Sequence, residues 1–451
     1  MPTPRRLALD ILHQVDKGTH TLDRCLDASA SAIEALNRAD RALVHALVYG
    51  VLRWKTRLDW TIDHYARQPS KIDPLVRTAL QIGLFQIFFM DRIPRPAAVH
   101  TAVELVKSGG RSWAAGFANG VLRRAADAPE PALPDPVADP LNALAVAYSF
   151  PRWLVARWRA RFGHAETEDL CRAMNQIPEI TLRTNTLRIE RNALLARITP
   201  DVQHAQVTPH TPEGIRFASP RRPLTEWETF REGAFQVQDE AAQIVGHLLA
   251  PRPGERLWDA CAGLGTKCAH MAQLMRNQGR ILATDTQPSK LLLLEKEMRR
   301  LGVHIVSASA MDLAAEQAPP PPETRFDRIL VDAPCSGLGV LQKNPDGKWR
   351  HAPQDLQRYR SQQVELLSAA AQHLRPQGVL VYAVCSFEPE ENTAVVEDFL
   401  QNHAEFAIQP PMLPSVQGAD GFISPRGFIQ TFPHRHRMDG FFAVALTRQS
   451  I

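Results

Sequence analysis

Two apolar stretches that each end in a cysteine constrain the fold more than any other feature of this chain. The first covers residues 329–331 and leads into Asp332 and Cys335, and the second runs from Val379 to Cys385, 50 residues after Cys335. Short continuous apolar runs of this kind are typical of buried strands. The pattern therefore predicts two strands that deliver a carboxylate and two thiols to one cleft.

A third stretch of strand type, residues 255–259, leads into a glycine-bearing turn. The turn and the start of the following helix consist of Cys261, Ala262, Gly263, Leu264, Gly265, Thr266 and Lys267. Such a turn lets the backbone approach a ligand closely, which is how doubly wound sheets bind nucleoside cofactors. One Gly-x-Gly alone is a weak signal.

Two acids strengthen the interpretation of this turn as a cofactor site. Asp285 ends the next predicted strand, 26 residues beyond Asp259, and Asp312 follows a third predicted strand. Asp285 is placed to bind both ribose hydroxyls, and Asp312 is placed to face the adenine end. Each acid alone has an alternative role as a helix cap or turn residue.

The residues around both cysteines resemble the motifs of RNA (cytosine-5) methyltransferases. The motifs are Asp332-Ala-Pro-Cys335-Ser-Gly and Cys385-Ser-Phe-Glu-Pro-Glu-Glu-Asn392. They are most similar to the bacterial RsmB (Sun, Fmu) branch, which modifies small-subunit ribosomal RNA. The resemblance covers residues 5–446. It implies an all-α NusB-like N-terminal domain, a small α/β region, and an α/β Rossmann-like class I methyltransferase domain that uses S-adenosyl-L-methionine.

The resemblance also implies a covalent mechanism. A thiolate adds to carbon 6 of cytosine, carbon 5 takes the methyl group, a base removes the proton at carbon 5, and the thiol is expelled. Asp332 would hold the cytosine amino group and N3. Reasoning from the residues leaves open which thiol attacks, and a single cysteine at a strand end is more often a small buried hydrophobe. Resemblance to the RNA enzymes assigns Cys385 as the nucleophile and Cys335 to product release.

The cofactor turn departs from the family pattern at two positions. Family members read Cys-Ala-Ala-Pro-Gly-Gly-Lys, whereas this chain has Leu264 at the proline position and Thr266 at the second glycine position. We expect a looser turn at Leu264, and at Thr266 a β-branched side chain where the backbone needs positive φ. Because Gly263 and Lys267 are retained, binding of S-adenosyl-L-methionine is expected to persist with altered affinity.

The N-terminal part of the chain is predicted to be helical, because apolar residues recur at four-residue spacing and residues 75–89 are almost entirely apolar. Its segments at residues 40–53, 93–99 and 116–123 resemble the NusB-type RNA-binding domain. Residues 1–126 carry 18 Lys and Arg against 11 Asp and Glu, whereas the remaining residues carry 34 against 37. This asymmetry fits contact with nucleic acid, and a solvated basic surface is the alternative.

The chain is expected to contain four segments. These are a NusB-like helical RNA-binding domain at residues 1–126, a proline-rich linker at 127–140, a small α/β region that contacts RNA at 141–235, and the catalytic domain at 236–451. The predicted RNA contacts of the small region are its conspicuous aromatic and basic side chains, with core packing as the alternative for the tryptophans. They are Trp153, Trp158, Arg183 and Arg188.

Two loops in the catalytic part carry further predictions. Residues 339–349 resemble the family loop that closes over the substrate. Lys343 and Lys348 are predicted to meet phosphates and Trp349 to stack on a base, with a solvated loop as the alternative. The proline run at residues 318–322 is predicted to be a surface loop of polyproline character.

The remaining features bear on location and partners. No stretch reaches the roughly 18 uninterrupted apolar residues of a membrane helix, and the first residues lack the apolar core of a signal peptide, so a cytoplasmic location is expected. Six cysteines among 451 residues, without paired CxxC spacing, predict reduced thiols and no metal site. RNA is the expected partner of a monomeric chain, with no membrane and no DNA. The alternatives are a related transfer RNA enzyme and a non-catalytic RNA-binding or ribosome assembly factor.

Overall fold

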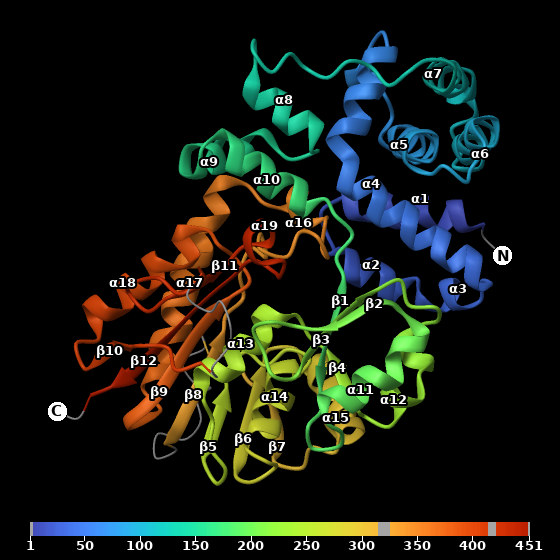
Figure 1. Ribbon diagram of the computed structural model, residues 1–451. Helices are drawn as coiled ribbons and strands as arrows, with labels where there is room; N and C mark the ends of the chain where they lie inside the picture. Colours follow the sequence, from blue (N-terminus) through green and yellow to red (C-terminus); the bar gives the residue numbers. More distant parts are fainter. Residues whose placement is uncertain (1–2, 314–324, 414–420, 450–451) are drawn as a thin grey trace. The chain divides into compact units, whose positions relative to one another are not determined.

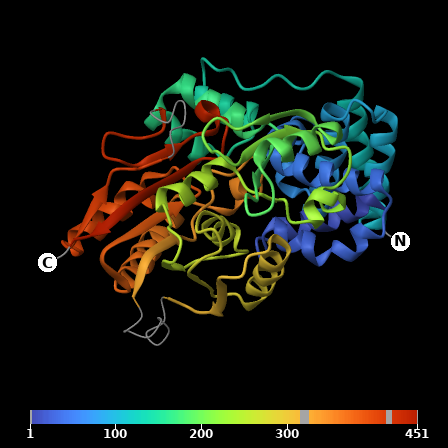
Figure 2. The same ribbon diagram turned by 60° about the horizontal axis from the view of Figure 1, so that its bottom comes forward.

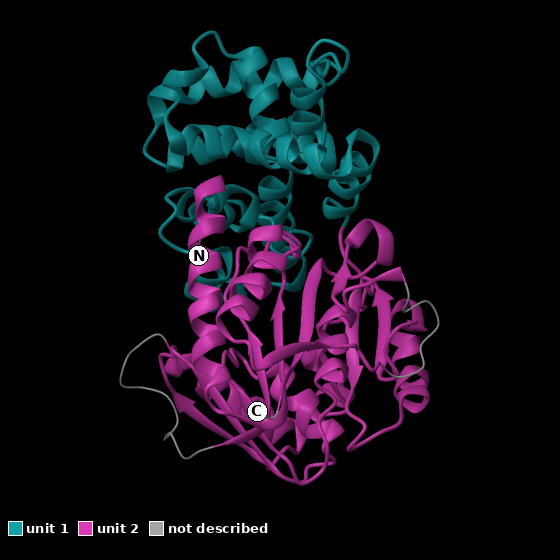
Figure 3. Ribbon diagram, turned by 90° about the vertical axis from the view of Figure 1, so that its left-hand side faces the viewer, with its two compact units in different colours: residues 1–176, 341–352 teal, residues 177–340, 353–451 magenta. Residues whose placement is uncertain are grey.

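The computed structural model describes residues 3–313, 325–413 and 421–449, which form two compact units (Figures 1 and 3). Unit 1 comprises residues 1–176 and 341–352, and unit 2 comprises residues 177–340 and 353–451. No helix within the described ranges is long and apolar enough to cross a membrane. The predicted proline loop at residues 318–322 lies outside the described residues.

Unit 1 is built from helices, as the spacing of its apolar residues predicts. Its most apolar helix, α5 (Pro74–Phe89), is capped by Asp73, whose carboxylate accepts hydrogen bonds from the N–H groups of Leu75 and Val76. α5 packs against α1, α4, α6 and α7, so that side chains on nearly all sides of the helix are buried. The α-helices of unit 1 are α1 (Pro4–Asp16), α2 (Leu22–Ala28), α3 (Ala30–Glu34), α4 (Arg38–Tyr65), α5, α6 (Arg95–Ser108), α7 (Ala115–Asp127), α8 (Pro140–Ala147), α9 (Arg152–Phe162), α10 (His164–Met174) and α16 (Gly347–Arg350).

The first part of unit 2 is a small antiparallel sheet with strand order β2-β3-β1-β4. Its helices pack beside it and its interior is filled by aromatic and aliphatic side chains. The elements are β1 (Ile180–Thr184), α11 (Arg191–Ile198), β2 (Gln203–Val207), β3 (Gly214–Ala218), α12 (Glu228–Arg231) and β4 (Phe235–Val237).

The second part of unit 2 is an eight-stranded sheet with order β10-β12-β9-β8-β5-β6-β7, and β11 pairs with β12. Strands β9, β8, β5, β6 and β7 are parallel, whereas β10, β11 and β12 are antiparallel to their neighbours. The elements are α13 (Glu240–Leu249), β5 (Arg256–Asp259), α14 (Thr266–Leu274), β6 (Arg280–Asp285), α15 (Pro288–Leu301), β7 (Val306–Ala310), β8 (Phe326–Asp332), α17 (Pro353–Ala371), β9 (Leu374–Val384), α18 (Thr393–Asn402), β10 (Phe406–Gln409), β11 (Ile429–Thr431), α19 (Pro433–His436) and β12 (Phe441–Arg448).

The central strands β8 and β9 are apolar on both faces because helices cover both faces of the sheet (Figures 1 and 2). Leu330 of β8 and Val381 of β9 pack in the core that contains α13, α14 and α15. Ile329 of β8 and Tyr382 of β9 pack in the core that contains α17 and α18. Strands β5 and β8 are neighbours although β6 and β7 separate them in sequence, and this reversal of strand order is where doubly wound sheets bind ligands.

Local pairing and a turn set two element boundaries in unit 2. α13 begins at Glu240, because residues 235–237 pair with β1 and Asp239 caps the helix. β1 ends at Thr184, because the N–H of Leu187 donates to Oδ1 of Asn185 and closes a turn there. The compact units divide the chain after residue 176, and the domain boundaries at residues 126, 140 and 235 stay predictions.

Candidate functional site

Cys335 and Cys385 lie side by side, with their sulfur atoms 3.3 Å apart. Strands β8 and β9 are parallel neighbours, and Asp332 is opposite Ala383 in their register. Parallel neighbours end at the same edge of a sheet, so the loops that follow them carry both thiols to one place. The hydrogen bond to Cys385, together with burial, raises the pKa of the Cys335 thiol well above its usual value. Cys335 is therefore protonated near neutral pH.

Asp332 joins this edge to the turn after β5 through an ion pair. Its Oδ2 atom lies 2.5 Å from Nζ of Lys267, which is on the first turn of α14. Burial acts to lower the pKa of Lys267, but the charge of Asp332 and this hydrogen bond raise it by more, so the net shift is upward. The ammonium also lies 5.3 Å from the centre of the Phe441 ring. The structure therefore brings Asp332 and Lys267 together at the reversal point of the sheet.

The turn after β5 depends on two glycines with left-handed backbone conformation. The φ angles are +55° at Gly263 and +78° at Gly265. Oδ2 of Asp285 accepts a hydrogen bond from the N–H of Gly263 at 3.1 Å, which ties the turn to the end of β6. A Cβ atom on Gly265 would lie 2.4 Å from Cγ of Leu294, so a side chain does not fit there.

The prediction that the backbone needs positive φ at Thr266 is wrong. Thr266 is the first residue of α14 and has an ordinary helical backbone, and the left-handed conformation falls on Gly265, one residue earlier. The side chain of Leu264 is 52% exposed and leaves apolar surface beside the turn. Cys261 is half-buried and Ala262 is buried within the turn, whereas Asp312 is exposed beyond β7.

Arg183 was predicted to contact RNA, and this prediction is wrong because its side chain is buried inside unit 2. Its guanidinium donates hydrogen bonds to the carbonyl oxygen of Thr266 at 2.9 Å, to the side chain of Gln236 at 2.9 Å, and to the side chain of Gln238. Arg183 thus supports the start of α14 from the small sheet. Trp158 is fully buried in unit 1, in agreement with its alternative role in the core.

Lys348 was predicted to meet a phosphate, but it is fully buried in unit 1. Its Nζ donates to the carbonyl oxygens of Arg53 at 3.0 Å and Ser149 at 3.1 Å, and to Oδ1 of Asn175 at 2.6 Å. Trp349 packs against the core of unit 1, and its indole N–H donates to a backbone carbonyl of α4 at 2.8 Å. The predicted phosphate contact of Lys348 is therefore wrong, whereas Trp349 is only partly buried and its stacking on a base stays a prediction.

Glu391 holds the loops of both cysteines, and sequence reasoning missed this role. Its carboxylate accepts hydrogen bonds from the N–H and hydroxyl of Ser336 at 2.7 and 2.5 Å, and from the hydroxyl of Ser386 at 2.6 Å. Gln363 donates to the same carboxylate at 3.2 Å. Burial raises the pKa of Glu391, and these donors oppose part of the rise. Since Ser336 follows Cys335 and Ser386 follows Cys385, one carboxylate fixes both thiol loops.

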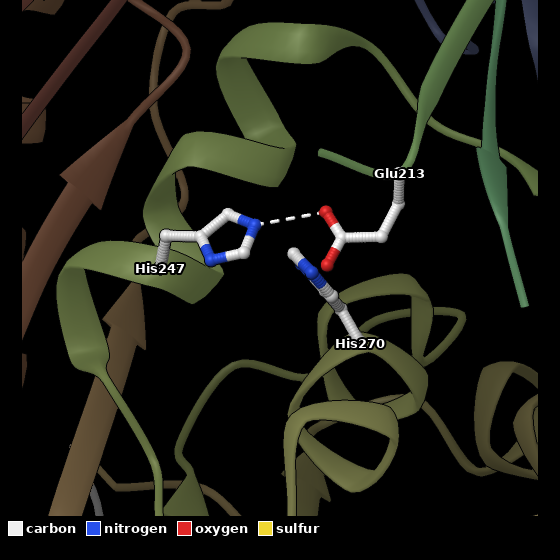
Figure 4. Close-up of side chains that lie close together, drawn as sticks. All are labelled: Glu213, His247 and His270. Carbon is white, nitrogen blue, oxygen red and sulfur yellow. Dashed lines mark hydrogen bonds and ion pairs between the residues drawn. The ribbon is translucent and has the colours of Figure 1, made fainter. Parts of the chain in front are cut away.

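A second buried polar cluster in unit 2 contains Glu213, His247 and His270 (Figure 4). Nε2 of His247 lies 2.9 Å from Oε2 of Glu213, and His270 rises from α14 toward this pair. The three side chains offer ligand atoms within 4.8 Å of one another. However, burial and the positive charge of Arg183 lower the pKa of His270 well below its usual value, and the same charge opposes a bound cation. We therefore interpret the cluster as a packing contact of α13 and α14 with the small sheet.

Three protein-family models match successive parts of the chain. They are the NusB family at residues 2–127, the RsmF/B-like ferredoxin-like domain at residues 150–223, and the 16S rRNA methyltransferase RsmB/F at residues 246–447. Together with the sheet order, they confirm the predicted fold class of a NusB-like helical domain, a small α/β region and a Rossmann-like methyltransferase domain.

Full-length relatives extend this similarity. The chain is 35% identical to the probable ribosomal RNA small subunit methyltransferase B of Synechocystis sp., over 99% of this chain and 100% of that protein. It is 32% identical to the probable ribosomal RNA small subunit methyltransferase B of Bacillus subtilis, over 99% of this chain and 98% of that protein. The crystal structure of PH0851 matches with a TM-score of 0.81 at 26% identity, over 99% of both chains.

Proposed function

The chain belongs to the RsmB/F family of methyltransferases, and we propose that it methylates carbon 5 of a cytosine in small-subunit ribosomal RNA. The single observation that carries this proposal is the pair of thiols 3.3 Å apart. Methyl transfer to an oxygen or nitrogen atom needs no thiol, whereas carbon 5 of cytosine becomes nucleophilic after a thiolate adds to carbon 6. A thiol pair at the reversal point of a doubly wound sheet fits this reaction.

S-adenosyl-L-methionine is the proposed methyl donor, and the turn after β5 fits it. A Cβ atom on Gly263 would meet nothing within 4 Å, so the backbone there is open to a close ligand. The binding residues would be Cys261, Ala262, Gly263, Leu264, Gly265, Thr266, Lys267, Asp285, Asp312 and Asp332. Asp285 would bind the ribose hydroxyls, and Asp312 would face the adenine end. The bound cofactor would supply the methyl group.

We assign Cys385 as the nucleophile. Its sulfur would form a bond to carbon 6 of cytosine, and carbon 5 would then take the methyl group. The sulfur of Cys335 lies 3.3 Å from that of Cys385 and would act in release. When a base from solvent takes the proton of carbon 5, the electron pair of that C–H bond would form the double bond to carbon 6 and the sulfur–carbon bond would break. The Cys335 thiol would then donate a hydrogen bond to the departing Cys385 thiolate. Asp332 would accept a hydrogen bond from the cytosine amino group.

Transfer of labelled methyl to RNA from cells that lack this gene tests the reaction. After digestion to nucleosides, the label is expected in 5-methylcytidine from the small-subunit RNA. Cys335→Ala is expected to accumulate protein bound covalently to RNA, because release is blocked. Cys385→Ala is expected to show neither turnover nor adduct. Continued methylation by Cys385→Ala would show that the assignment is wrong.

Two alternatives give different results in the same assay. Label confined to transfer RNA would keep the chemistry and replace the substrate. No label in any RNA, with folded protein and no binding in a titration with S-adenosyl-L-methionine, would favour an RNA-binding or assembly factor. We expect the protein to act in the cytoplasm, as a monomer, on RNA rather than DNA.

A further inference from the structure

Two aromatic side chains of unit 1 lie four residues apart in sequence and are exposed to solvent. Trp113, in the short 3-10 helix at Ser112–Ala114, is 73% exposed, and Phe117, in the first turn of α7, is 39% exposed. The core of unit 1 contains most of its other large apolar side chains. An exposed aromatic pair that the core leaves out is typical of a binding surface.

Two glycines of α7 leave the helix backbone open next to these rings. A Cβ atom on Gly116 or Gly120 would meet nothing within 4 Å, and neither residue has positive φ. Glycine lowers the stability of a helix interior relative to alanine, so neither packing nor backbone conformation accounts for it here. The missing side chains leave space in which a flat ring can approach the helix.

The same residues line a groove of about 470 Å³ whose rim is cationic. Its basic residues are Arg67, Lys71 and Arg124. The acid in the lining, Asp73, caps α5 and also accepts a hydrogen bond from Arg111 at 2.8 Å, so its charge is already compensated. Cations around aromatic rings are the combination that holds a nucleic-acid backbone while bases stack.

The cationic surface continues along the other side of Gly116. A second hollow of about 880 Å³ includes this glycine among its lining residues. Its basic residues are Arg95, Lys107 and Arg123, and His100 lies among them. Two acids also line this hollow, Asp127 and Glu104, and Glu104 pairs with Lys107 at 2.7 Å. Three cations against two acids leave the hollow with a net charge of +1.

We propose that this groove of α7 binds single-stranded RNA, with bases stacked on Trp113 and Phe117 and phosphates held by Arg67, Lys71 and Arg124. A single strand is required because bases must be unstacked before side chains can reach their faces. The inference rests on the proposed RNA substrate and names the surface that holds it.

The test is the binding of a fluorescein-labelled single-stranded RNA to the full chain, measured by fluorescence anisotropy without cofactor. Trp113→Ala is expected to weaken binding about tenfold, because it removes one stacking platform, and Trp113→Phe is expected to restore most of it. Lys71→Ala is expected to reduce the salt dependence of the binding constant by about one phosphate contact.

Gly120→Leu separates loss of the site from loss of the fold. The new side chain would enter open space and replace a poor helix former, so the melting temperature is expected to rise while RNA binding falls about tenfold. Lys17→Ala, an exposed cation outside the groove, is the matched control and should bind as the wild type does. In methyl transfer, the groove variants should raise KM and leave kcat unchanged.

Unchanged RNA binding by both Trp113→Ala and Gly120→Leu would overturn the proposal. The proposal would also be overturned if the groove variants lost as much affinity for duplex RNA of the same sequence as for the single strand, because stacking needs unpaired bases. Loss of binding to another protein, with RNA binding intact, would assign the groove to a protein partner instead. If the wild type binds RNA through the groove but transfers no methyl, the proposed reaction fails and the groove assignment stands.

Discussion

Glu391 of unit 2 and Lys348 of unit 1 are both ionisable, both fully buried and both hydrogen-bonded to several partners, but their partners give them different roles. Burial raises the pKa of Glu391 and lowers the pKa of Lys348 well below its usual value. Glu391 accepts hydrogen bonds from Ser336 and Ser386, the residues that directly follow the two thiols. Lys348 donates hydrogen bonds to the carbonyl oxygen of Arg53 in α4, to the carbonyl oxygen of Ser149, and to the side chain of Asn175 at the end of α10. These acceptors belong to three separate parts of unit 1. Glu391 connects the two thiol loops, and Lys348 joins helices.

The comparison teaches that burial of an ionisable side chain near a cysteine motif does not reveal the role of that side chain. Lys348 lies 13 residues after Cys335 in sequence and has the charge that phosphate binding needs, yet its three hydrogen bonds go to oxygen atoms of unit 1. Glu391 is an acid among other acids in its segment, yet it connects both thiol loops. The role follows from which segments the partners belong to.

Replacement of Lys348 by methionine should give the largest effect on stability. It would leave three buried oxygen atoms without their donor, so we expect a loss of about 3–5 kcal/mol in the free energy of unfolding. Urea denaturation followed by circular dichroism measures this. Cofactor affinity of the folded fraction should persist, because the turn after β5 belongs to unit 2.

Lys107→Met is the matched control for this substitution. Lys107 forms an exposed ion pair with Glu104, and its loss should change stability by less than about 0.5 kcal/mol. If Lys348→Met were as stable as the wild type but unable to bind RNA, the structural role of Lys348 would be wrong and the comparison with Glu391 would fail.

Replacement of Glu391 by alanine should act on turnover more than on stability. Without the carboxylate, the two thiol loops lose their shared partner, and misplacement of reacting groups by about 1 Å can reduce rates about 100-fold. We expect kcat for methyl transfer to fall by about that factor and KM for RNA to stay nearly constant. Steady-state kinetics with small-subunit RNA measures both.

Glu391→Gln tests whether position or charge matters at this site. An amide keeps one oxygen acceptor for the Ser336 N–H, and the two serine hydroxyls can rotate to accept from its NH₂ group. Glu391→Gln should therefore keep most of the activity that the alanine variant loses. Glu397→Ala, on the exposed side of α18, should be as active as the wild type. Equal inactivity of the glutamine and alanine variants would argue against a positioning role.

The fold and the meeting of the thiols were accessible from the sequence because each rests on a pattern with one physical cause. Apolar runs in β8 and β9 predict buried strands, and the parallel pairing of these strands then places Cys335 beside Cys385. The helices of unit 1 follow in the same way from four-residue spacing, and their likeness to the NusB domain came from the resemblance of three segments.

The partners of polar side chains were not accessible in this way. Arg183 and Lys348 belong to segments whose composition fits an RNA surface, and only the folded chain shows that each is enclosed by backbone and amide oxygens. The role of Glu391 was missed for the same reason. Its donor Ser336 is distant in sequence, and nothing in the sequence distinguishes Ser336 or Ser386 from other serines. The groove at Trp113 was missed because the residue type alone does not show whether a side chain is exposed.

The smallest expected effect is that of Thr266→Gly at the start of α14, where the position of a residue in the fold again decides its role. Thr266→Gly should change the affinity for S-adenosyl-L-methionine by less than about twofold and destabilise the chain by less than about 1 kcal/mol, because residue 266 is helical and glycine is a poorer helix former. Gly265→Ala is the contrasting variant, since its Cβ would meet Leu294 and its φ is positive. Calorimetric titration should show weaker binding for Gly265→Ala alone. Tighter binding by Thr266→Gly would restore the view that threonine at this position impairs the turn.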